Sequence, residues 1–239
     1  MVNKEETMEE TVNDAPREKR FLLARAEAKA LEWIARRLPK RVMPDHLTML
    51  GVAAAVGIAA AYVLSNENPV WLWAASALLV VHWFGDSLDG TLARVRKTQR
   101  PTYGYYLDHL VDAIATALIG LGLGLSPYML LSTGLVIVVV YLVLSINTYL
   151  ETYAFGVFSL GYGRVGPTEA RIALIALNAA MALGAGLSFE VAGLGVTALD
   201  LVGLGLSALA IAALAVRATH NLRVLAEREP AEVVSWRPG

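Results

Sequence analysis

The stretch that decides the fold reads DSLDGTLAR at residues 86–94 and, nine residues later, GYYLDHLVD at residues 104–112. Its four carboxylates form two pairs spaced i, i+3 and i, i+4, so each pair lies on one face of a helix: Asp86 with Asp89, and Asp108 with Asp112. Uncharged, mostly apolar runs adjoin the stretch at residues 69–85 and 113–150. Carboxylates beside hydrocarbon are costly without a partner, which predicts that these side chains bind cations. Oxygen ligands at this density favour Mg²⁺, Mn²⁺ or Ca²⁺.

The composition is that of a membrane protein. Of the 239 residues, 56% are apolar and 17% are charged, against roughly 45–50% and 25% in typical soluble proteins. The net charge of −1 gives no indication of a nucleic-acid partner. The absence of cysteine excludes disulfides, thiolate metal sites and a cysteine nucleophile. Because no apolar segment leads the chain, we expect no secretory signal peptide.

Several apolar segments are long enough to cross a membrane as helices. The uncharged run Ala113–Leu150 is too long for one helix, and Pro127 predicts a turn that divides it into two. The predicted spans are therefore six: 47–64, 69–85, two within 113–150, 172–189 and 191–216. Glycines repeat in these spans and are predicted to let neighbouring helices approach closely, at positions 120, 122, 124, 193, 195, 203 and 205.

The basic residues predict the orientation of these spans. All twenty Lys and Arg lie before the first span, after the last, or in the connections that follow the second and fourth spans. Basic residues of short loops stay on the cytoplasmic side. We therefore expect an all-α integral membrane protein, in the cytoplasmic membrane or an endomembrane. Six transmembrane helices form its bundle, and both termini and the carboxylates face the cytoplasm.

The segments outside the spans differ in composition. Residues 1–16 are polar and acidic, which predicts a disordered tail. Residues 17–39 mix apolar and basic side chains at helical spacing and end at a proline, which predicts an N-terminal amphipathic helix in the membrane interface. The alternative is a solvated helix packed on the cytoplasmic loops. We assign residues 40–225 to the six-helix domain and residues 226–239 to a C-terminal tail.

The stretch of residues 86–112 resembles the signature of the CDP-alcohol phosphotransferase family, D-x-x-D-G-x-x-A-R-(x)n-G-x-x-x-D-x-x-x-D. All of its fixed positions are filled: Asp86, Asp89, Gly90, Ala93, Arg94, Gly104, Asp108 and Asp112. The resemblance covers about residues 40–220. It implies a membrane transferase of phospholipid biosynthesis that moves a substituted phosphate, expected to be phosphatidyl, from a CDP-alcohol to an acceptor alcohol and releases CMP. It also implies one or two Mg²⁺ or Mn²⁺ ions.

The residue types fit such a transfer. Two divalent ions can neutralise a diphosphate and hold both the attacking and the leaving oxygen, and the natural metal ligands are Asp86, Asp89 and Asp108. The resemblance implies that Asp112 also contacts a metal. Asp112 directly precedes the apolar run, where a carboxylate becomes a better proton acceptor. In the family, the matching last Asp is the general base, so Asp112 is also the expected catalytic residue. For binding of the CDP donor, glycine permits close approach and arginine offers a forked donor to phosphate, which indicates Gly90, Arg94 and Gly104. The resemblance implies that Ala93, a fixed position of the same signature, also lines the donor site.

Two further elements extend this reading. VMPDHLT at 42–48 resembles the Pro-Asn/Asp-x-x-Thr start of the family's first helix, which implies that Asp45 and Thr48 bind the donor; the same residues also make an ordinary helix start. Thr102 occupies a place where relatives often put a donor-binding Ser or Thr. GRVGPTEAR at 163–171 resembles acceptor segments of choline, ethanolamine and inositol-phosphate transferases. It implies acceptor contacts from Arg164, Glu169 and Arg171, although Thr168-Glu169 is also a routine helix start.

The acidic residues and apolar spans leave two alternative functions. An Asp-rich membrane prenyltransferase requires a second Asp-rich motif, yet Asp200 is the only aspartate after residue 112. A transporter is expected to show charges near the membrane midplane or two related halves.

The expected partners of the transferase are a donor (CDP-diacylglycerol or a CDP-linked headgroup), a small alcohol or lipid acceptor, membrane lipid and a second copy of the chain in a homodimer.

Overall fold

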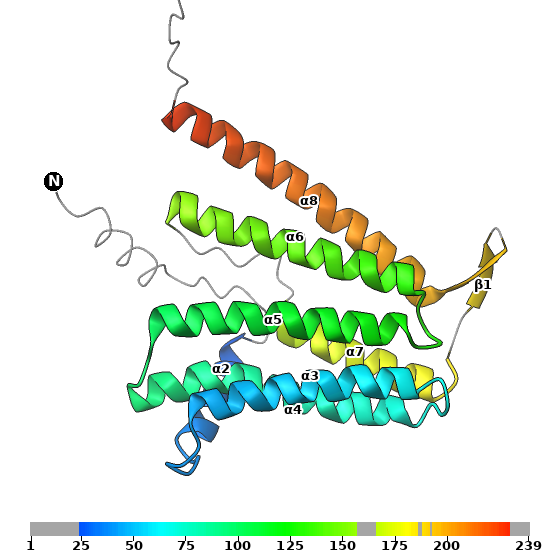
Figure 1. Ribbon diagram of the computed structural model, residues 1–239, viewed down its shortest axis with the longest axis horizontal. Helices are drawn as coiled ribbons and strands as arrows, with labels where there is room; N and C mark the ends of the chain where they lie inside the picture. Colours follow the sequence, from blue (N-terminus) through cyan, green and yellow to red (C-terminus); the bar gives the residue numbers. More distant parts are fainter. Residues whose placement is uncertain (1–23, 157–165, 186–187, 192, 230–239) are drawn as a thin grey trace, which may run out of the picture.

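The computed structural model describes residues 24–156, 166–185, 188–191 and 193–229, and most of them are helical (Figure 1). Within these residues there are seven helices and one hairpin of two short antiparallel strands. The elements are, in order, α2 Ala24–Ala35, α3 Pro44–Leu64, α4 Trp71–Arg96, α5 Pro101–Gly124, α6 Leu131–Phe155, α7 Pro167–Ala182, β1 Ser188–Val191, β2 Leu194–Thr197 and α8 Ala198–Arg228.

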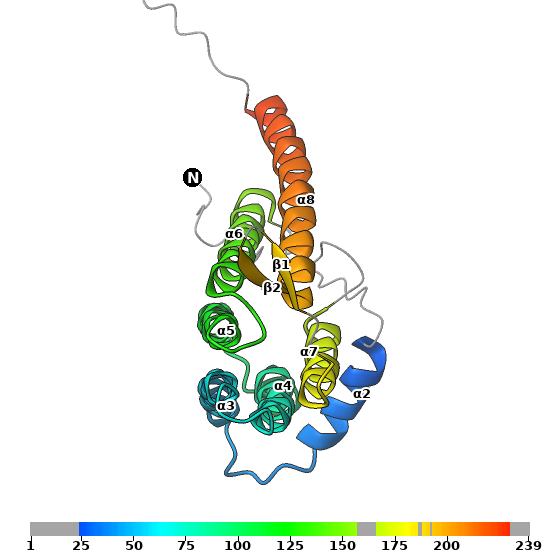
Figure 2. The same cartoon turned by 90° about the vertical axis from the view of Figure 1, so that its right-hand side faces the viewer.

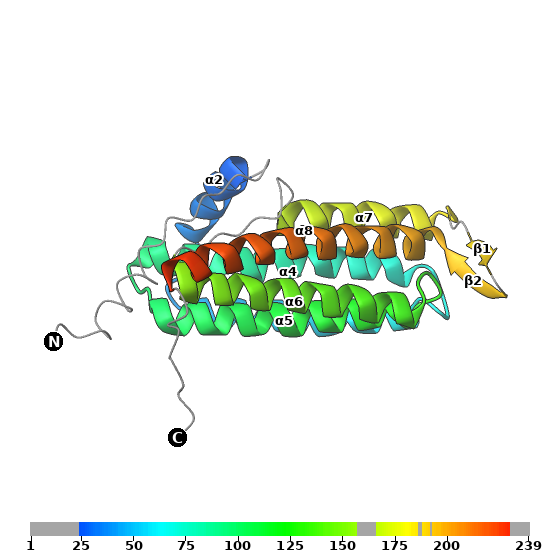
Figure 3. The same ribbon diagram turned by 90° about the horizontal axis from the view of Figure 1, so that it is seen from above.

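The long helices run along one common direction (Figures 1 and 3). Viewed end on, they follow one another in the spatial order α7, α4, α3, α5, α6, α8, in which each helix packs on the next (Figure 2). The short helix α2 packs on α4. The larger apolar core lies between these helices and includes Ile58, Tyr62, Leu72 and Leu79, all at most 1% exposed. This order places α4 and α5, which carry the four aspartates, on either side of α3.

Four of the helices in the described chain are long and apolar enough to cross a membrane: α3, α5, α6 and α8. Many large apolar side chains on these helices are exposed, including Val56, Leu135, Leu206 and Leu209. Exposure of such a surface to water is unfavourable, whereas an apolar surface is expected where a protein contacts lipid. The chain is therefore an integral membrane protein.

The ends of the predicted spans are partly confirmed and partly corrected. The long run 113–150 divides as predicted, because α5 ends at Gly124 and α6 begins at Leu131. The predicted fifth and sixth spans are wrong at their facing ends. Helix α7 stops at Ala182, and residues 188–197 form the hairpin of β1 and β2. Gly193 takes a positive φ of 78° in this turn, a conformation that favours glycine and interrupts a helix.

Helix α8, which corresponds to the predicted sixth span, is displaced toward the C-terminus. It begins at Ala198, where the Thr197 side chain accepts a hydrogen bond from the backbone N–H of Asp200, and it continues to Arg228. A capping threonine with an acidic residue three positions later fixes a helix start. The sequence pattern had placed Asp200 inside the span because the segment before it is equally apolar.

The N-terminal helix covers part of the predicted amphipathic segment, because residues 1–23 lie outside the described part of the chain. Leu31 and Ala35 of α2 are 5% and 2% exposed and pack in a cluster with Leu47, Leu88 and Leu92. Trp33, on another side of α2, is 58% exposed. Helix α2 thus has one face buried against the protein and a large apolar side chain left outside it.

Glycine lets helices approach closely at several of the predicted positions. A Cβ added at Gly122 would lie 2.6 Å from Ala59 Cα, and one added at Gly203 would lie 2.8 Å from Ile137 Cδ1. Gly120 and Gly124 face α6 at similarly close range. The prediction is wrong for Gly193, Gly195 and Gly205, where an added Cβ meets no atom of the described residues within 4 Å. Gly193 and Gly195 lie in the turn and strand of the hairpin and not in a helix.

Candidate active site

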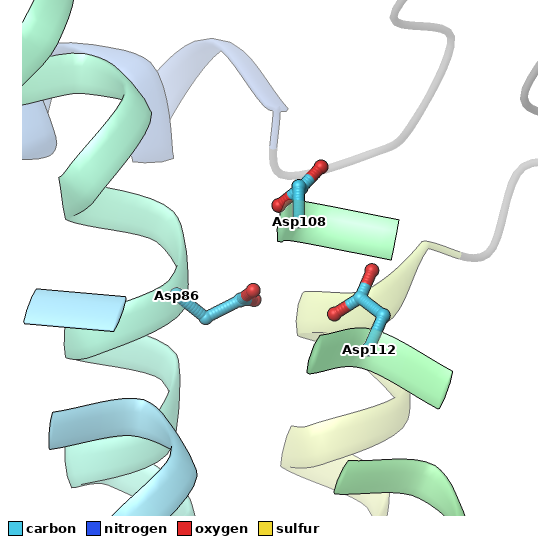
Figure 4. A group of neighbouring side chains, drawn as sticks. All are labelled: Asp86, Asp108 and Asp112. Carbon is cyan, nitrogen blue, oxygen red and sulfur yellow. The ribbon is translucent and has the colours of Figure 1, made fainter. Parts of the chain in front are cut away.

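Three carboxylates meet between α4 and α5: Asp86, Asp108 and Asp112, here named the Asp trio. One carboxylate oxygen of each lies within 4.8 Å of the others, and all three residues are half-buried. Figure 4 shows Asp86 reaching from α4 toward Asp108 and Asp112, which lie one turn apart on α5. Asp86 and the two aspartates of α5, which follow it by more than twenty positions in the sequence, thus form one acidic cluster.

The connection between α4 and α5 makes this meeting possible. Lys97 ends α4 in a left-handed conformation (φ 56°), and the backbone N–H of Thr98 donates to the carbonyl of Ala93. Pro101 then starts α5, a favoured position for proline because the first turn needs no backbone donor. The chain therefore reverses within a few residues, and the aspartates on the two helices face each other.

The Asp trio suits a hard divalent cation. Three negative charges within 4.8 Å repel one another, and burial strengthens that repulsion. Carboxylate oxygens are the ligands that Mg²⁺ and Mn²⁺ prefer. The donor set therefore fits the metal expected from the sequence.

Arg171 of α7 completes the cluster from a third helix. Its guanidinium donates to Asp86 Oδ2 at 2.6 Å, and the two side chains are 14% and 20% exposed. The sequence had placed Arg171 among residues for the acceptor, in a segment remote from the aspartates. The structure brings it next to Asp86, where it balances part of the charge of the Asp trio.

Asp89 is not among the carboxylates that lie within 4.8 Å of one another. Its Oδ2 accepts a hydrogen bond of 2.6 Å from the hydroxyl of Thr48 on α3, and its Oδ1 accepts one from the backbone N–H of Gly90. Thr48 is only 7% exposed. Two residues predicted for different roles, metal binding and donor binding, are thus joined directly and connect α3 to α4.

Asp45 forms an ion pair at the start of α3. Arg100, directly before α5, donates to both of its carboxylate oxygens at 2.6 and 2.7 Å. These hydrogen bonds to Asp45 raise the pKa of the Arg100 guanidinium. Arg100 also lies over the ring of Tyr103, 3.9 Å from its centroid. The pair is exposed at the cytoplasmic ends predicted for α3 and α5.

The other predicted donor residues line the same ends of the helices. Arg94 is exposed and donates to the hydroxyl of Thr91 at 2.9 Å. Gly90, Thr102 and Gly104 are exposed, while Ala93 is half-buried. A Cβ at Gly104 would meet nothing within 4 Å, and one at Gly90 would meet only the tip of Arg94 at 3.5 Å. Neither glycine is required by packing within the described residues, so open space lies beside both.

The predicted acceptor segment is only partly described. Arg164 lies outside the described residues. Glu169 accepts a hydrogen bond of 3.0 Å from the backbone N–H of Gly166 and so caps the start of α7. The helix-start interpretation of Glu169 therefore has a contact in the structure. Arg171, three residues after Thr168, is the member of the segment that reaches the Asp trio.

An aromatic cluster beside the Asp trio was missed by the sequence reasoning. His109 lies next to Asp108, and its ring centroid is 4.1 Å from that of Tyr105 and 4.9 Å from that of Tyr149. The i, i+4 spacing of Tyr105 and His109 could have indicated their contact. The approach of Tyr149 from α6 could not be read from spacing, because it depends on how α5 and α6 pack.

A comparison with known families identifies a match over the region that contains these residues. The sequence model described as CDP-alcohol phosphatidyltransferase matches residues 41–199, about two thirds of the chain. The matched region includes α3 to α7 and so contains all members of the Asp trio, Thr48, Asp89 and Arg171.

Proposed function

The chain belongs to the CDP-alcohol phosphatidyltransferase family, and on that premise we propose that it transfers a phosphatidyl group from CDP-diacylglycerol to an acceptor alcohol. CMP is the second product, and the reaction serves phospholipid biosynthesis. The observation that carries this proposal is the meeting of Asp86, Asp108 and Asp112 with Arg171, all within the family-matched region. The family match favours this reaction over the prenyltransferase and transporter alternatives.

The proposed metal ligands are the Asp trio, for one or two Mg²⁺ or Mn²⁺ ions. Asp89 is the further proposed ligand; its carboxylate is held by Thr48 and Gly90 and lies on the same helix as Asp86. When bound, the ions neutralise the diphosphate of the donor and the charge that develops on the leaving CMP. The three half-buried carboxylates are what this chain supplies for that role.

The donor is proposed to bind at the cytoplasmic ends of α3, α4 and α5. Gly90 and Gly104 leave space for its phosphates and nucleoside. Arg94 can present two N–H groups to a phosphate oxygen. Thr48, Asp45, Ala93 and Thr102 surround this space from the same helix ends. Binding here places the diphosphate next to the Asp trio.

The proposed chemical step is one displacement at phosphorus. The acceptor hydroxyl oxygen forms a bond to the phosphorus that bears the lipid alcohol, while the bond from that phosphorus to the CMP oxygen breaks. CMP leaves with the electron pair, and the hydroxyl proton moves to the carboxylate of Asp112. Of the two aspartates on α5, Asp112 lies closer to the apolar part of the helix. Desolvation there favours proton uptake by a carboxylate.

The acceptor is proposed to meet Arg171, with Glu169 and Arg164 in the same segment. A guanidinium beside the trio suits a phosphorylated alcohol, such as glycerol phosphate or inositol phosphate. In the structure the Arg171 side chain contacts Asp86. An acceptor phosphate at this place competes with Asp86 for the same N–H groups.

The proposed topology has six spans, in which α4 and α7 cross beside α3, α5, α6 and α8. Helix α7 has 16 residues, about 24 Å at 1.5 Å per residue, so it needs a thin or locally adapted bilayer. Both termini and the Asp trio face the cytoplasm. A single cysteine at Lys97 should react with an impermeant reagent only from the cytoplasmic side. Labelling of this cysteine from outside would contradict the proposed orientation.

The reaction is tested by CMP release. Purified protein is given CDP-diacylglycerol labelled in the cytidine, with glycerol 3-phosphate, inositol phosphate or serine as acceptor. We expect CMP release that needs one of these acceptors, stops in EDTA and returns with Mg²⁺ or Mn²⁺. The matched control is Asp86→Asn, which keeps the shape of the side chain without its charge. If none of the acceptors causes CMP release, the proposed donor and acceptors are contradicted.

A further inference from the structure

Glu27 of α2 joins three helices through one oxygen. Its Oε1 accepts a hydrogen bond of 2.8 Å from the indole N–H of Trp83 on α4 and another of 2.8 Å from the hydroxyl of Thr168 on α7. The three residues are separated by 56 and 141 positions in the sequence. Helix α2 thus contacts both helices that carry the Asp86–Arg171 ion pair.

This arrangement differs from the other acidic contact of α2. Glu32 pairs with Arg36, which lies four residues later and directly after the end of α2, and both side chains are more than half exposed. Glu27 is half-buried, and its donors come from other helices. A buried carboxylate needs hydrogen-bond donors, and bonds to an ionised acceptor are stronger than neutral ones. Glu27 therefore fixes α4 and α7 relative to each other, whereas Glu32 affects only its own helix.

Each of the two donors lies one turn from one partner of the Asp86–Arg171 ion pair. Thr168 and Arg171 are three residues apart on the first turn of α7, so they share one face of that helix. Trp83 precedes Asp86 by three residues on α4. The contacts of Glu27 and the Arg171–Asp86 ion pair therefore link the same two helices at neighbouring turns.

We propose that Glu27 is a positioning residue that holds Arg171 in place for the acceptor, through its bonds to Thr168 and Trp83. The inference rests on the proposed function of the Asp trio, and it assigns to the N-terminal helix a part in acceptor binding. Glu27 touches neither substrate nor the reacting atoms. Its effect passes through the first turn of α7.

The kinetic test compares Glu27→Ala, Glu27→Gln and the control Glu32→Ala in the CMP-release assay. We expect Glu27→Ala to raise the KM of the acceptor by about three- to tenfold, the range expected for losing hydrogen bonds, with the KM of CDP-diacylglycerol unchanged. Glu27→Gln should restore most of the loss, because its amide oxygen can accept the same two bonds. Glu32→Ala should behave as the wild type. A Glu27→Ala variant that behaves as the Glu32→Ala control would overturn the proposal.

A double variant separates positioning from a general structural effect. If Glu27 acts through Arg171, the double variant Glu27→Ala/Arg171→Ala should have the same acceptor KM as Arg171→Ala alone. Multiplicative losses in the double variant would contradict action through Arg171.

Hydrogen exchange tests the contact without any catalysis. In the detergent-solubilised full chain, Glu27→Ala should speed amide exchange over residues 168–172 severalfold, whereas Glu32→Ala should leave it unchanged. Unchanged exchange in Glu27→Ala would overturn the inference whatever the kinetics. If the wild type releases no CMP with any acceptor, the proposed function fails, and this exchange measurement still decides whether Glu27 holds α7.

Discussion

Helices α3 and α4 are joined differently from helices α6 and α8. Of the most apolar stretch of each helix, 44% is buried in α3 but only 17% in α8. Helices α3 and α4 meet backbone to backbone: a Cβ added at Gly85 would lie 2.6 Å from the carbonyl oxygen of Leu47. Gly85 directly precedes Asp86, so this close contact between helices lies beside the Asp trio.

Helix α8 is instead attached to α6 by polar contacts near its two ends. At one end, Asp200 is fully buried and accepts hydrogen bonds from the backbone N–H groups of Leu130 and Thr197, both at 2.8 Å. At the other end, Glu151 of α6 forms an ion pair with Arg217 of α8 and accepts a hydrogen bond from Asn221. Between them lies an open apolar groove of about 210 Å³ lined by α6 and α8.

The acidic residues of the two regions therefore have different surroundings. Asp200 and Glu151 are each met by several donors from the protein itself, as expected for charges that hold helices together in lipid. The carboxylates of the Asp trio face one another, and the guanidinium of Arg171 pairs with one of them, Asp86. Local satisfaction of charge indicates a structural role, and convergence of like charges indicates a site for a cation.

The largest expected effect is on catalysis by the Asp trio. Asp112→Asn should lower kcat by about 10²- to 10⁴-fold, the range for losing a general base, with little change in CDP-donor binding. Asp200→Asn, the matched change in the other region, should lower stability while the folded fraction keeps its turnover. Steady-state CMP release and donor binding of both variants measure this. Loss of donor binding without a defect in the chemical step would make Asp112 a metal ligand first.

A smaller effect is expected where α8 is attached. Arg217→Leu removes the cation that pairs with Glu151, whose side chain is only 9% exposed. Losing hydrogen bonds to a charged group costs about 1.5–3 kcal/mol, so thermal unfolding should occur at a lower temperature. Turnover per folded molecule should stay near wild type, since this ion pair joins α6 to α8, whereas the Asp trio lies between α4 and α5. A large loss of turnover in fully folded Arg217→Leu would show that the two regions are coupled.

The smallest of the three effects is expected from added methyl groups. Gly85→Ala must displace backbone atoms of α3, and overpacking of this kind costs about 1–3 kcal/mol. Gly205→Ala on α8 meets open space and should be neutral or slightly stabilising, because alanine favours helix over glycine. Denaturation of the two variants side by side compares the regions directly. Equal stability of both would mean that α3 and α4 are no more tightly joined than α8.

The sequence predicted most of what depends on local pattern. Apolar length located the helices, Pro127 located the turn before α6, and the spacing of Asp108 and Asp112 placed them on one face of α5. It failed at residues 188–197, because an apolar run containing glycine fits a hairpin as well as a helix. The hairpin is set by the turn at Gly193 and the cap formed by Thr197 and Asp200.

Contacts between distant elements could not be predicted from spacing. Arg171 was singled out for an acceptor, but its ion pair with Asp86 depends on the packing of α7 against α4. The hydrogen bond between Thr48 and Asp89 likewise requires α3 and α4 to be in register. Glu27 carries no motif at all, and its role follows only from the two donors that reach it from other helices.

The most direct test of the account is binding of Mn²⁺ to the purified protein, followed by electron paramagnetic resonance. We expect one or two bound ions per chain, and Asp→Asn at residue 86, 108 or 112 should weaken binding by at least about tenfold. Asp200→Asn, which changes the buried structural carboxylate of α8, should leave the binding unchanged. Equal Mn²⁺ affinity in the wild type and all three variants of the trio would contradict the assignment of these carboxylates to a metal centre.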